Sequence, residues 1–340
     1  MDPVLLRAYA TSLLVRGLVS LPVPVLRRLG GRPPAVAREL EPEAWFLARL
    51  ATLAERLAGG RSIPPLDEQR VIADAETRFL AVGPRRPVHT EDRTADGIPV
   101  RLYVPEGAND EGPLLVFFHG GGWVQRSIAS HDASVRLLAH LSGIRIVSVE
   151  YRRAPEHPFP TPVDDALAAY THIATHAGAY GADPTRIGVG GDSAGGNLAA
   201  GVALTADPRP AFQWLLYPAV DAVNRHPSAK AFATGFYLTE AAMDKYIDLY
   251  LPDRDRRADP RASPLLAADL SAMPPAYVAI AAADPLRDEG EAYAQRLRDA
   301  GVPAVTQRFG QLHGFFNVTV MRSAREAVAV TAGALRHGLR

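Results

Sequence analysis

A serine flanked by small residues, Gly191-Asp-Ser-Ala-Gly195, lies near the middle of the chain and has the potential for nucleophilic chemistry. Residues 186–190 before it favour a short strand, and residues 198–204 after it favour a buried helix. Gly-x-Ser-x-Gly between a strand and a helix is typical of a nucleophile elbow, where the turn is so sharp that only glycine fits beside the serine. Taken alone, the pattern also fits a glycine-rich loop. Ser193 is therefore a candidate nucleophile whose partners must be found elsewhere.

A serine hydroxyl is a weak nucleophile and needs a base, which in turn needs an orienting acid. On a strand–elbow–helix scaffold these follow in the order serine, acid, histidine. Asp284 directly follows the apolar run 276–282, and the carboxyl end of a strand in an open parallel sheet is where ligand chemistry is placed. Asp288 is the competing acid, but Asp288-Glu-Gly-Glu291 resembles a capping box that opens a helix. We therefore predict that Asp284 is the orienting acid and that Asp288 is a helix cap.

Two histidines, His313 and His337, lie downstream of Asp284. His337 is three residues from the end of the sequence in a basic tail, which favours a solvated or helix-end role. His313 lies in a glycine-flanked loop after the last predicted strand, and such a loop can present an imidazole to the elbow. We predict that His313 is the general base.

Acyl transfer also needs donors for the oxyanion of the tetrahedral intermediate. His119-Gly-Gly-Gly-Trp123 follows an apolar run at 114–118, and its consecutive glycines let backbone amides approach a substrate without interference from a Cβ atom. We predict that the amides of Gly121, Gly122 and Ala194 are the donors. The alternative, a flexible hairpin loop, does not explain why this motif stands one strand-helix-strand-helix-strand stretch before the serine. The flanking side chains predicted to support the site or contact substrate are His119, Trp123 and Asp192.

The composition is that of an ordinary globular protein: 340 residues, 47% hydrophobic and 22% charged. Basic and acidic residues balance at 37 each, so the net charge favours neither nucleic acid nor an acidic membrane surface as a partner. The absence of cysteine excludes disulfides and thiolate chemistry. His172 and His176 have helical i, i+4 spacing but lack the glutamate of a zinc-protease helix, which favours a solvated helix face. We predict no metal and no cofactor.

The N-terminal residues 4–26 are apolar, but Arg7 and Arg16 interrupt them and Pro22 and Pro24 break them. The stretch fits neither a secretory signal nor a membrane-spanning helix. Nine positions separate the two arginines, which places them on opposite faces of a helix, unlike a surface-lying anchor. We predict a helix packed onto the fold or over its active site, in a cytoplasmic protein; peripheral membrane contact by this helix is the alternative.

Strand and helix patterns alternate from residue 86 onward, which predicts an α/β fold with a mostly parallel sheet and helices on both faces. Residues 1–85 have helical patterns and form a predicted cap or lid segment, in which one helix ends at Gly59-Gly60 and a linker covers 62–65. Residues 218–274 are polar and proline-rich without a convincing strand, and they form a predicted cap insertion in the catalytic domain 86–340. The predicted strands are 88–90, 100–104, 114–118, 144–149, 186–190, 212–216, 276–282 and 304–309; the predicted helices include 43–57, 66–80, 162–177, 239–251, 289–300 and one from about 320.

With these motifs in order, the sequence resembles the hormone-sensitive-lipase-like branch of the α/β-hydrolases, the bacterial family IV esterases with a Gly-Asp-Ser-Ala-Gly motif. Tyr151-Arg-Arg-Ala-Pro-Glu156 is similar to that family's Tyr-Arg-Leu-Ala-Pro-Glu box, with Arg153 in place of the leucine, and Ser263-Pro-Leu265 also matches. The resemblance covers about residues 85–340.

The resemblance implies the α/β-hydrolase fold, hydrolysis of short- to medium-chain acyl or aryl esters, and no cofactor. By the same resemblance the nucleophile, base and orienting acid would be Ser193, His313 and Asp284, with oxyanion donors Gly121, Gly122 and Ala194. Alternatives on the same triad are an interface-active lipase, an amide or acetyl-group deacylase, and an acyltransferase. A non-catalytic ligand receptor is a further alternative, although receptors of this kind typically lose the histidine. Relatives often form homodimers through a sheet edge, which implies a possible homodimer.

Overall fold

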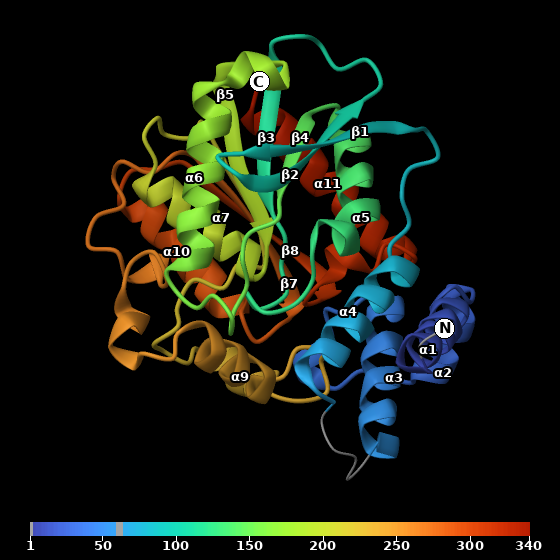
Figure 1. The fold of residues 1–340 in the computed structure, drawn as a ribbon. Helices are drawn as coiled ribbons and strands as arrows, with labels where there is room; N and C mark the ends of the chain where they lie inside the picture. Colours follow the sequence, from blue (N-terminus) through green and yellow to red (C-terminus); the bar gives the residue numbers. More distant parts are fainter. Residues whose placement is uncertain (1–2, 59–63) are drawn as a thin grey trace.

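The structure is a computed structural model of the chain and describes residues 3–58 and 64–340. Eight strands form one sheet in the spatial order β1-β2-β4-β3-β5-β6-β7-β8 (Figure 1). β1 pairs antiparallel with β2, and β2 antiparallel with β4, whereas all later neighbours are parallel. The mostly parallel sheet predicted from the alternating pattern is therefore confirmed. In chain order the strands are β1 (Val88–Ala95), β2 (Ile98–Pro105), β3 (Gly112–Phe118), β4 (Arg145–Val149), β5 (Ala182–Asp192), β6 (Gln213–Leu216), β7 (Ala276–Ala283) and β8 (Ala304–Leu312).

The central strands are mostly apolar because helices cover both faces of the sheet. Every residue of β7 is buried, and its side chains alternate between two cores. Val278 and Ile280 belong to one core, together with residues of α6 (Thr161–Thr175), α7 (Ala194–Thr205) and α10 (Arg287–Asp299). Tyr277 and Ala279 belong to the other, with residues of α5 (Ile128–Ser142) and α11 (Arg322–Gly338). The strand ends that carry the candidate residues are thus held from both sides.

Four helices precede the sheet: α1 (Pro3–Val19), α2 (Val23–Gly30), α3 (Pro42–Ala58) and α4 (Leu66–Leu80). The apolar stretch 4–26 is interrupted at Pro22, as the sequence predicts, and α2 begins after it; Pro24 lies in the first turn of α2 and does not break it. α1 packs on α4, where the rings of Tyr9 and Phe79 meet edge to face at 4.9 Å and Arg16 Nη1 donates to the Phe79 carbonyl at 3.0 Å. The predicted helix end at residues 59–60 and the linker residues 62–63 lie outside the described residues.

The segment between β6 and β7 contains helices and turns, among them α8 (Pro227–Ala231) and α9 (Glu240–Tyr250), and no strand in residues 217–275, all of which the structure describes. In Figure 1 the N-terminal helices and α9 lie at the same end of the sheet. Among the described helices, none is by itself long and apolar enough to span a membrane. Residues of α1 and α2 reach the required length and composition only together, across a bend of 108°.

Candidate active site

Ser193 lies at the turn between β5 and α7, in a backbone conformation that non-glycine residues rarely adopt (φ 56°, ψ −120°). Such strain persists only where the surroundings hold the chain in place. Here the Ser193 amide donates to the Leu216 carbonyl of β6 at 2.9 Å, and the Ser193 carbonyl accepts from the Asn197 amide at 3.1 Å. Neighbouring strand and following helix therefore fix the turn that presents the hydroxyl.

The two glycines of the motif are required by the closeness of the backbone around the turn. A Cβ atom added at Gly195 would come well within 3.0 Å of the Phe118 carbonyl on β3, and one at Gly191 would collide with Gly195 itself. Real Cβ atoms do not approach backbone so closely. These two contacts explain why only glycine fits on both sides of the serine, as the sequence predicts.

We expect Gly195→Ala to lower the free energy of unfolding by about 3 kcal/mol or more, because the overlap involves backbone atoms that cannot move independently. Gly178→Ala is the matched control: a Cβ atom there would have no neighbour within 4 Å, so its stability should equal that of the wild type. Thermal and urea unfolding of both variants measure the difference. Equal stabilities for the two variants would contradict the tight turn.

His313 connects the serine to a buried acid. Its Nε2 lies 2.9 Å from Ser193 Oγ, and its Nδ1 lies 2.7 Å from Asp284 Oδ2. Asp284 follows β7 and is fully buried, and its Oδ1 accepts the Leu286 amide at 2.8 Å. A carboxylate facing Nδ1 places the proton on that nitrogen, which leaves the Nε2 lone pair directed at the serine hydroxyl. The structure thus brings together the three residues that the sequence pointed to, from three separate loops. The alternative histidine, His337, lies exposed in the last turn of α11.

The expectation for Asp288 is wrong. Asp288 lies inside α10, whose N-cap position is Leu286 and has no side-chain cap hydrogen bond. The Asp288 carboxylate instead accepts the Ser228 amide at 2.8 Å and pairs with Arg287 at 2.8 Å. The capping pattern is local, whereas the actual partner belongs to α8 of the insertion, 60 residues away in sequence. Asp288 therefore links α8 of the insertion to α10.

Three backbone amides in the lining of the pocket have no hydrogen-bond acceptor among the described residues. Gly121 and Gly122 follow β3 with φ of 124° and 62°, values that favour glycine. Ala194 is the first residue of α7, where helix geometry leaves the amide without an intrahelical acceptor. Among hydrogen bonds between described residues, none has the Gly121, Gly122 or Ala194 amide as donor. All three residues line the same pocket as Ser193 and His313.

Asp192 connects the loop between β3 and α5, residues 119–127 (the glycine loop), to the turn at Ser193. Its Oδ1 accepts the Gly120 amide at 2.8 Å and lies 3.1 Å from His131 Nε2. Burial opposes ionisation of this carboxyl, but His131 and the Gly120 amide outweigh burial and hold its pKa below the ordinary value. Asp192 therefore fixes the position of the loop that presents Gly121 and Gly122.

His119 and Trp123 flank the glycines with different surroundings. His119 is fully buried, and its ring stacks on Tyr151 at a centroid distance of 4.4 Å. Burial lowers the pKa of His119 to about 3, so its imidazole is neutral at ordinary pH. Trp123 lines the pocket and stacks on Tyr250 at 4.4 Å. His119 is thus a buried support, whereas Trp123 is part of the pocket wall.

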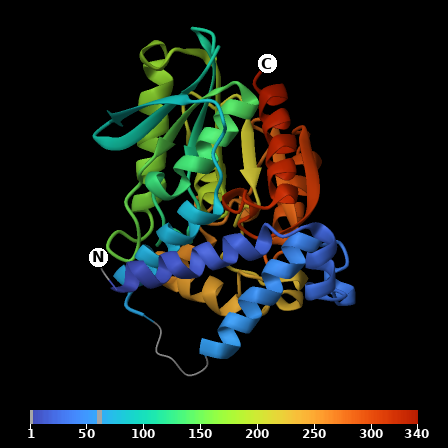
Figure 2. The same cartoon turned by 90° about the vertical axis from the view of Figure 1, so that its right-hand side faces the viewer.

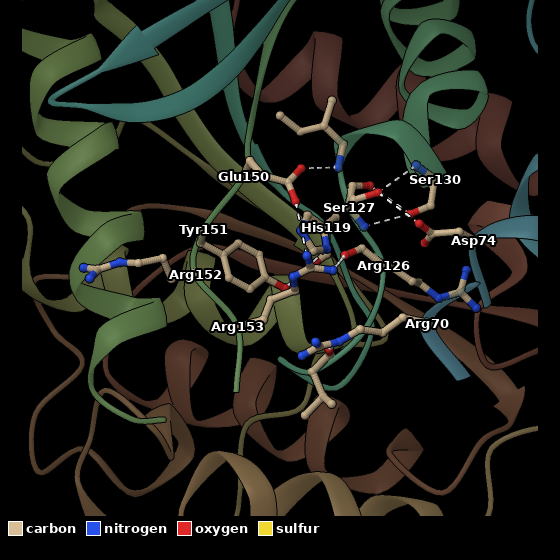
Figure 3. Close-up of polar contacts among 12 residues, drawn as sticks. Arg70, Asp74, His119, Arg126, Ser127, Ser130, Glu150, Tyr151, Arg152 and Arg153 are labelled. Atoms are coloured by element: carbon tan, nitrogen blue, oxygen red, sulfur yellow. Dashed lines mark hydrogen bonds and ion pairs between the residues drawn. The ribbon is translucent and has the colours of Figure 1, made fainter. Parts of the chain in front are cut away.

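Arg70 of α4 connects the N-terminal helices to the glycine loop by hydrogen bonds (Figure 3). Its guanidinium donates to the Val124 carbonyl at 2.9 Å, to the Ala154 carbonyl at 3.0 Å, and to both Glu156 oxygens at 2.8 and 2.7 Å. Arg153, which departs from the family pattern, donates to the Arg126 carbonyl on the same loop. Through these hydrogen bonds the Tyr151–Glu156 segment connects α4 to the glycine loop.

The pocket above Ser193 has a volume of about 280 Å³. Its walls come from α4, from the loop after β3 and from the insertion around α9. Sequence reasoning did not identify the charged and aromatic lining residues Glu76, Arg126, Tyr237 and Tyr246. Burial raises the pKa of the Glu76 carboxyl. These residues belong to no motif, and only the packing of the N-terminal helices and of the segment between β6 and β7 against the rest of the fold brings them together.

No group of three or more metal-binding side chains occurs in the described part of the chain, residues 3–58 and 64–340. His172 and His176, which have the spacing of paired ligands, lie at the C-terminal end of α6 with their rings stacked at 4.4 Å. His172 is partly exposed and His176 is exposed, so the pair lies on a face that is open to solvent.

Comparison with known proteins agrees with this geometry. The family model described as alpha/beta hydrolase fold matches residues 115–317. Carboxylic ester hydrolase LipN of Mycobacterium tuberculosis is 46% identical over 271 residues, which span 74% of this chain and 72% of that protein. Ethyl acetate hydrolase of Pseudomonas putida is 38% identical over 257 residues, which span 72% of this chain and 81% of that protein.

Among solved structures, this chain is also similar to an ester hydrolase. The ester-hydrolase EH1AB1 from the metagenome of Lake Arreo, complexed with a derivative of bipyridine phosphonate, superposes with a TM-score of 0.82 at 39% identity. The alignment covers 88% of this chain and 98% of that one. The stretch matched by the family model contains the glycine loop, Ser193, Asp284 and His313. The chain therefore belongs to the α/β-hydrolase family, in its hormone-sensitive-lipase-like branch of carboxylic-ester hydrolases.

Proposed function

We propose that this protein hydrolyses carboxylic esters through an acyl-enzyme on Ser193. In this proposal His313 is the general base, Asp284 orients it, and the amides of Gly121, Gly122 and Ala194 bind the oxyanion. The observation that carries the proposal is the continuous hydrogen-bonded series from Asp284 Oδ2 through His313 to Ser193 Oγ, at 2.7 and 2.9 Å. It ends in a pocket that also contains the three amides.

The reaction follows from this arrangement. Ser193 Oγ attacks the ester carbonyl carbon while His313 Nε2 takes the hydroxyl proton. The carbonyl oxygen becomes an oxyanion, which accepts hydrogen bonds from the loop and helix amides. Collapse of the intermediate breaks the ester C–O bond, and His313 returns the proton to the departing alkoxide. A water molecule, activated by His313, then attacks the acyl-enzyme and releases the carboxylic acid and the free serine.

The pocket supports short- to medium-chain acyl or aryl esters. Its volume of about 280 Å³ is at the lower end of small-molecule sites. Apolar side chains of the insertion, Leu238, Met243 and Ile247, form part of the wall, so an acyl chain or aryl ring would replace water there. The similarity to an ethyl acetate hydrolase agrees with a small ester as substrate. The cytoplasmic location and the homodimer expected from the sequence stay predictions.

Hydrolysis of p-nitrophenyl esters from acetate to palmitate tests the proposal. We expect turnover of the short and medium esters and a steep loss for chains that exceed the pocket. Highest activity on emulsified long-chain esters would favour an interface-active lipase instead. Inactivity on every ester would contradict the proposal and favour an amide deacylase, an acyltransferase or a ligand receptor on the same fold.

A further inference from the structure

Large apolar side chains are exposed on one part of this protein. Among the described residues, ten Leu or Val side chains are strongly exposed, and seven of them lie within the first 53 residues. Scattered exposed apolar residues are normal, whereas their concentration on one segment marks an interaction surface. The seven are Leu6, Leu13, Leu14, Val25, Leu29, Val36 and Leu53.

Helix α1 presents a continuous apolar face to solvent. Leu6, Leu13 and Leu14 are 48%, 53% and 64% exposed, and the exposed Ala10 and Gly17 lie between and beyond them. The spacing i, i+4, i+7, i+8, i+11 places all five on one side of the helix. Figure 2 shows α1 running across the outside of the other N-terminal helices. Arg16, which counted against a surface anchor in the sequence, turns instead to the Phe79 carbonyl of α4.

The same segment concentrates positive charge. Residues 3–38 contain six arginines and no lysine, aspartate or glutamate, although the whole chain has equal numbers of basic and acidic residues. Arg27, Arg28, Arg32 and Arg38 are all exposed. An apolar helix face and the exposed arginines that follow it in the chain match the two components of an anionic bilayer surface, acyl chains and negative headgroups. A second copy of this chain would bring the same positive charges together, which disfavours association through this face.

We propose that α1 and α2 form a docking surface for an anionic phospholipid membrane. Leu6, Leu13 and Leu14 insert at the level of the headgroups, and Arg27 and Arg28 contact the phosphates. Docking brings α4, which packs beneath α1 and lines the pocket through Glu76, close to the bilayer. The surface is independent of the reaction at Ser193.

Co-sedimentation with vesicles tests the proposal, using pure phosphatidylcholine and an equal mixture of phosphatidylcholine and phosphatidylglycerol. We expect binding to the mixed vesicles only, and weaker binding as salt is raised. Arg27→Ala combined with Arg28→Ala should weaken binding roughly 30-fold. Leu13→Ser combined with Leu14→Ser should weaken it more than about tenfold.

Val330→Ser and Arg336→Ala on α11 are matched controls, since both residues are exposed far along the chain from this surface. They should bind like the wild type, and every variant should hydrolyse soluble p-nitrophenyl acetate at the wild-type rate. Absence of binding to both vesicles, or equal binding by all variants, would overturn the proposal. So would a dimer that the leucine variant converts to a monomer, because a second copy would then cover the face.

Discussion

Ser193→Ala is expected to reduce kcat/KM for p-nitrophenyl butyrate by about 10⁵-fold. The hydroxyl is the only group in the pocket that lies within hydrogen-bonding distance of His313 Nε2 in the described residues. Without it no acyl-enzyme forms, and only the oxyanion donors and substrate binding remain to accelerate attack by water. Steady-state kinetics on wild type and variant measure the loss.

Covalent labelling separates loss of the nucleophile from loss of the fold. An organophosphate such as diethyl p-nitrophenyl phosphate should add one phosphoryl group to the wild type at Ser193 and none to the variant, as read by mass spectrometry. Ser271→Ala, at an exposed serine bound to Asp269, is the control and should retain wild-type kinetics. If Ser193→Ala keeps its rate, or if the label appears at another residue, the proposed role of Ser193 is wrong.

Asp284→Asn is expected to reduce kcat by about 10⁴-fold with little change in structure. The carboxylate accepts a hydrogen bond from the N–H at His313 Nδ1, at 2.7 Å, and so leaves Nε2 free as a base. An asparagine amide can donate to Nδ1, which favours the tautomer with its proton on Nε2. That tautomer cannot accept the serine proton. Pre-steady-state kinetics should show a slower acylation step.

Asp288→Asn is the matched control, because it replaces the alternative acid four residues away. Asp288 bonds to Ser228 and Arg287 and not to His313, so its substitution should change stability more than kcat. Circular dichroism and thermal unfolding check that both variants fold. A larger fall in kcat for Asp288→Asn than for Asp284→Asn would reverse the assignment of the orienting acid.

Some features of the site were predictable because their causes are local. Gly191 and Gly195 are needed by a single sharp turn, Asp284 follows an apolar run typical of a buried strand, and His313 follows the last stretch predicted as a strand. The ends of parallel strands meet at one edge of the sheet, so residues that follow them converge without any further information. The sequence pattern therefore pointed to the histidine that the structure places 2.7 Å from Asp284 and 2.9 Å from Ser193.

Predictions that depended on distant partners were less reliable. The acidic pattern at the start of α10 is typical of a cap, yet Asp288 bonds to α8 because the insertion folds back over the sheet. The hydroxyl of Ser263 also bonds to groups that its sequence motif does not indicate. It accepts the Ala222 amide at 2.9 Å and donates to the Arg257 carbonyl at 2.6 Å, within the insertion. A local sequence pattern indicates which groups can form hydrogen bonds. It does not indicate which group from a distant part of the chain will lie close enough to be the partner.

The sequence by itself determined the order of strands and helices, the strained serine turn and the residues grouped around it, because backbone sterics and strand ends are set by neighbouring residues. Only the tertiary structure decided that Glu76, Arg126 and Tyr246 share the pocket, since they come from three segments far apart in the sequence. It also decided which side of α1 is exposed. In α1 apolar residues lie on every side and the two arginines on opposite faces, so the sequence carries no signal for its buried face, and the packing of α1 on α4 makes that choice.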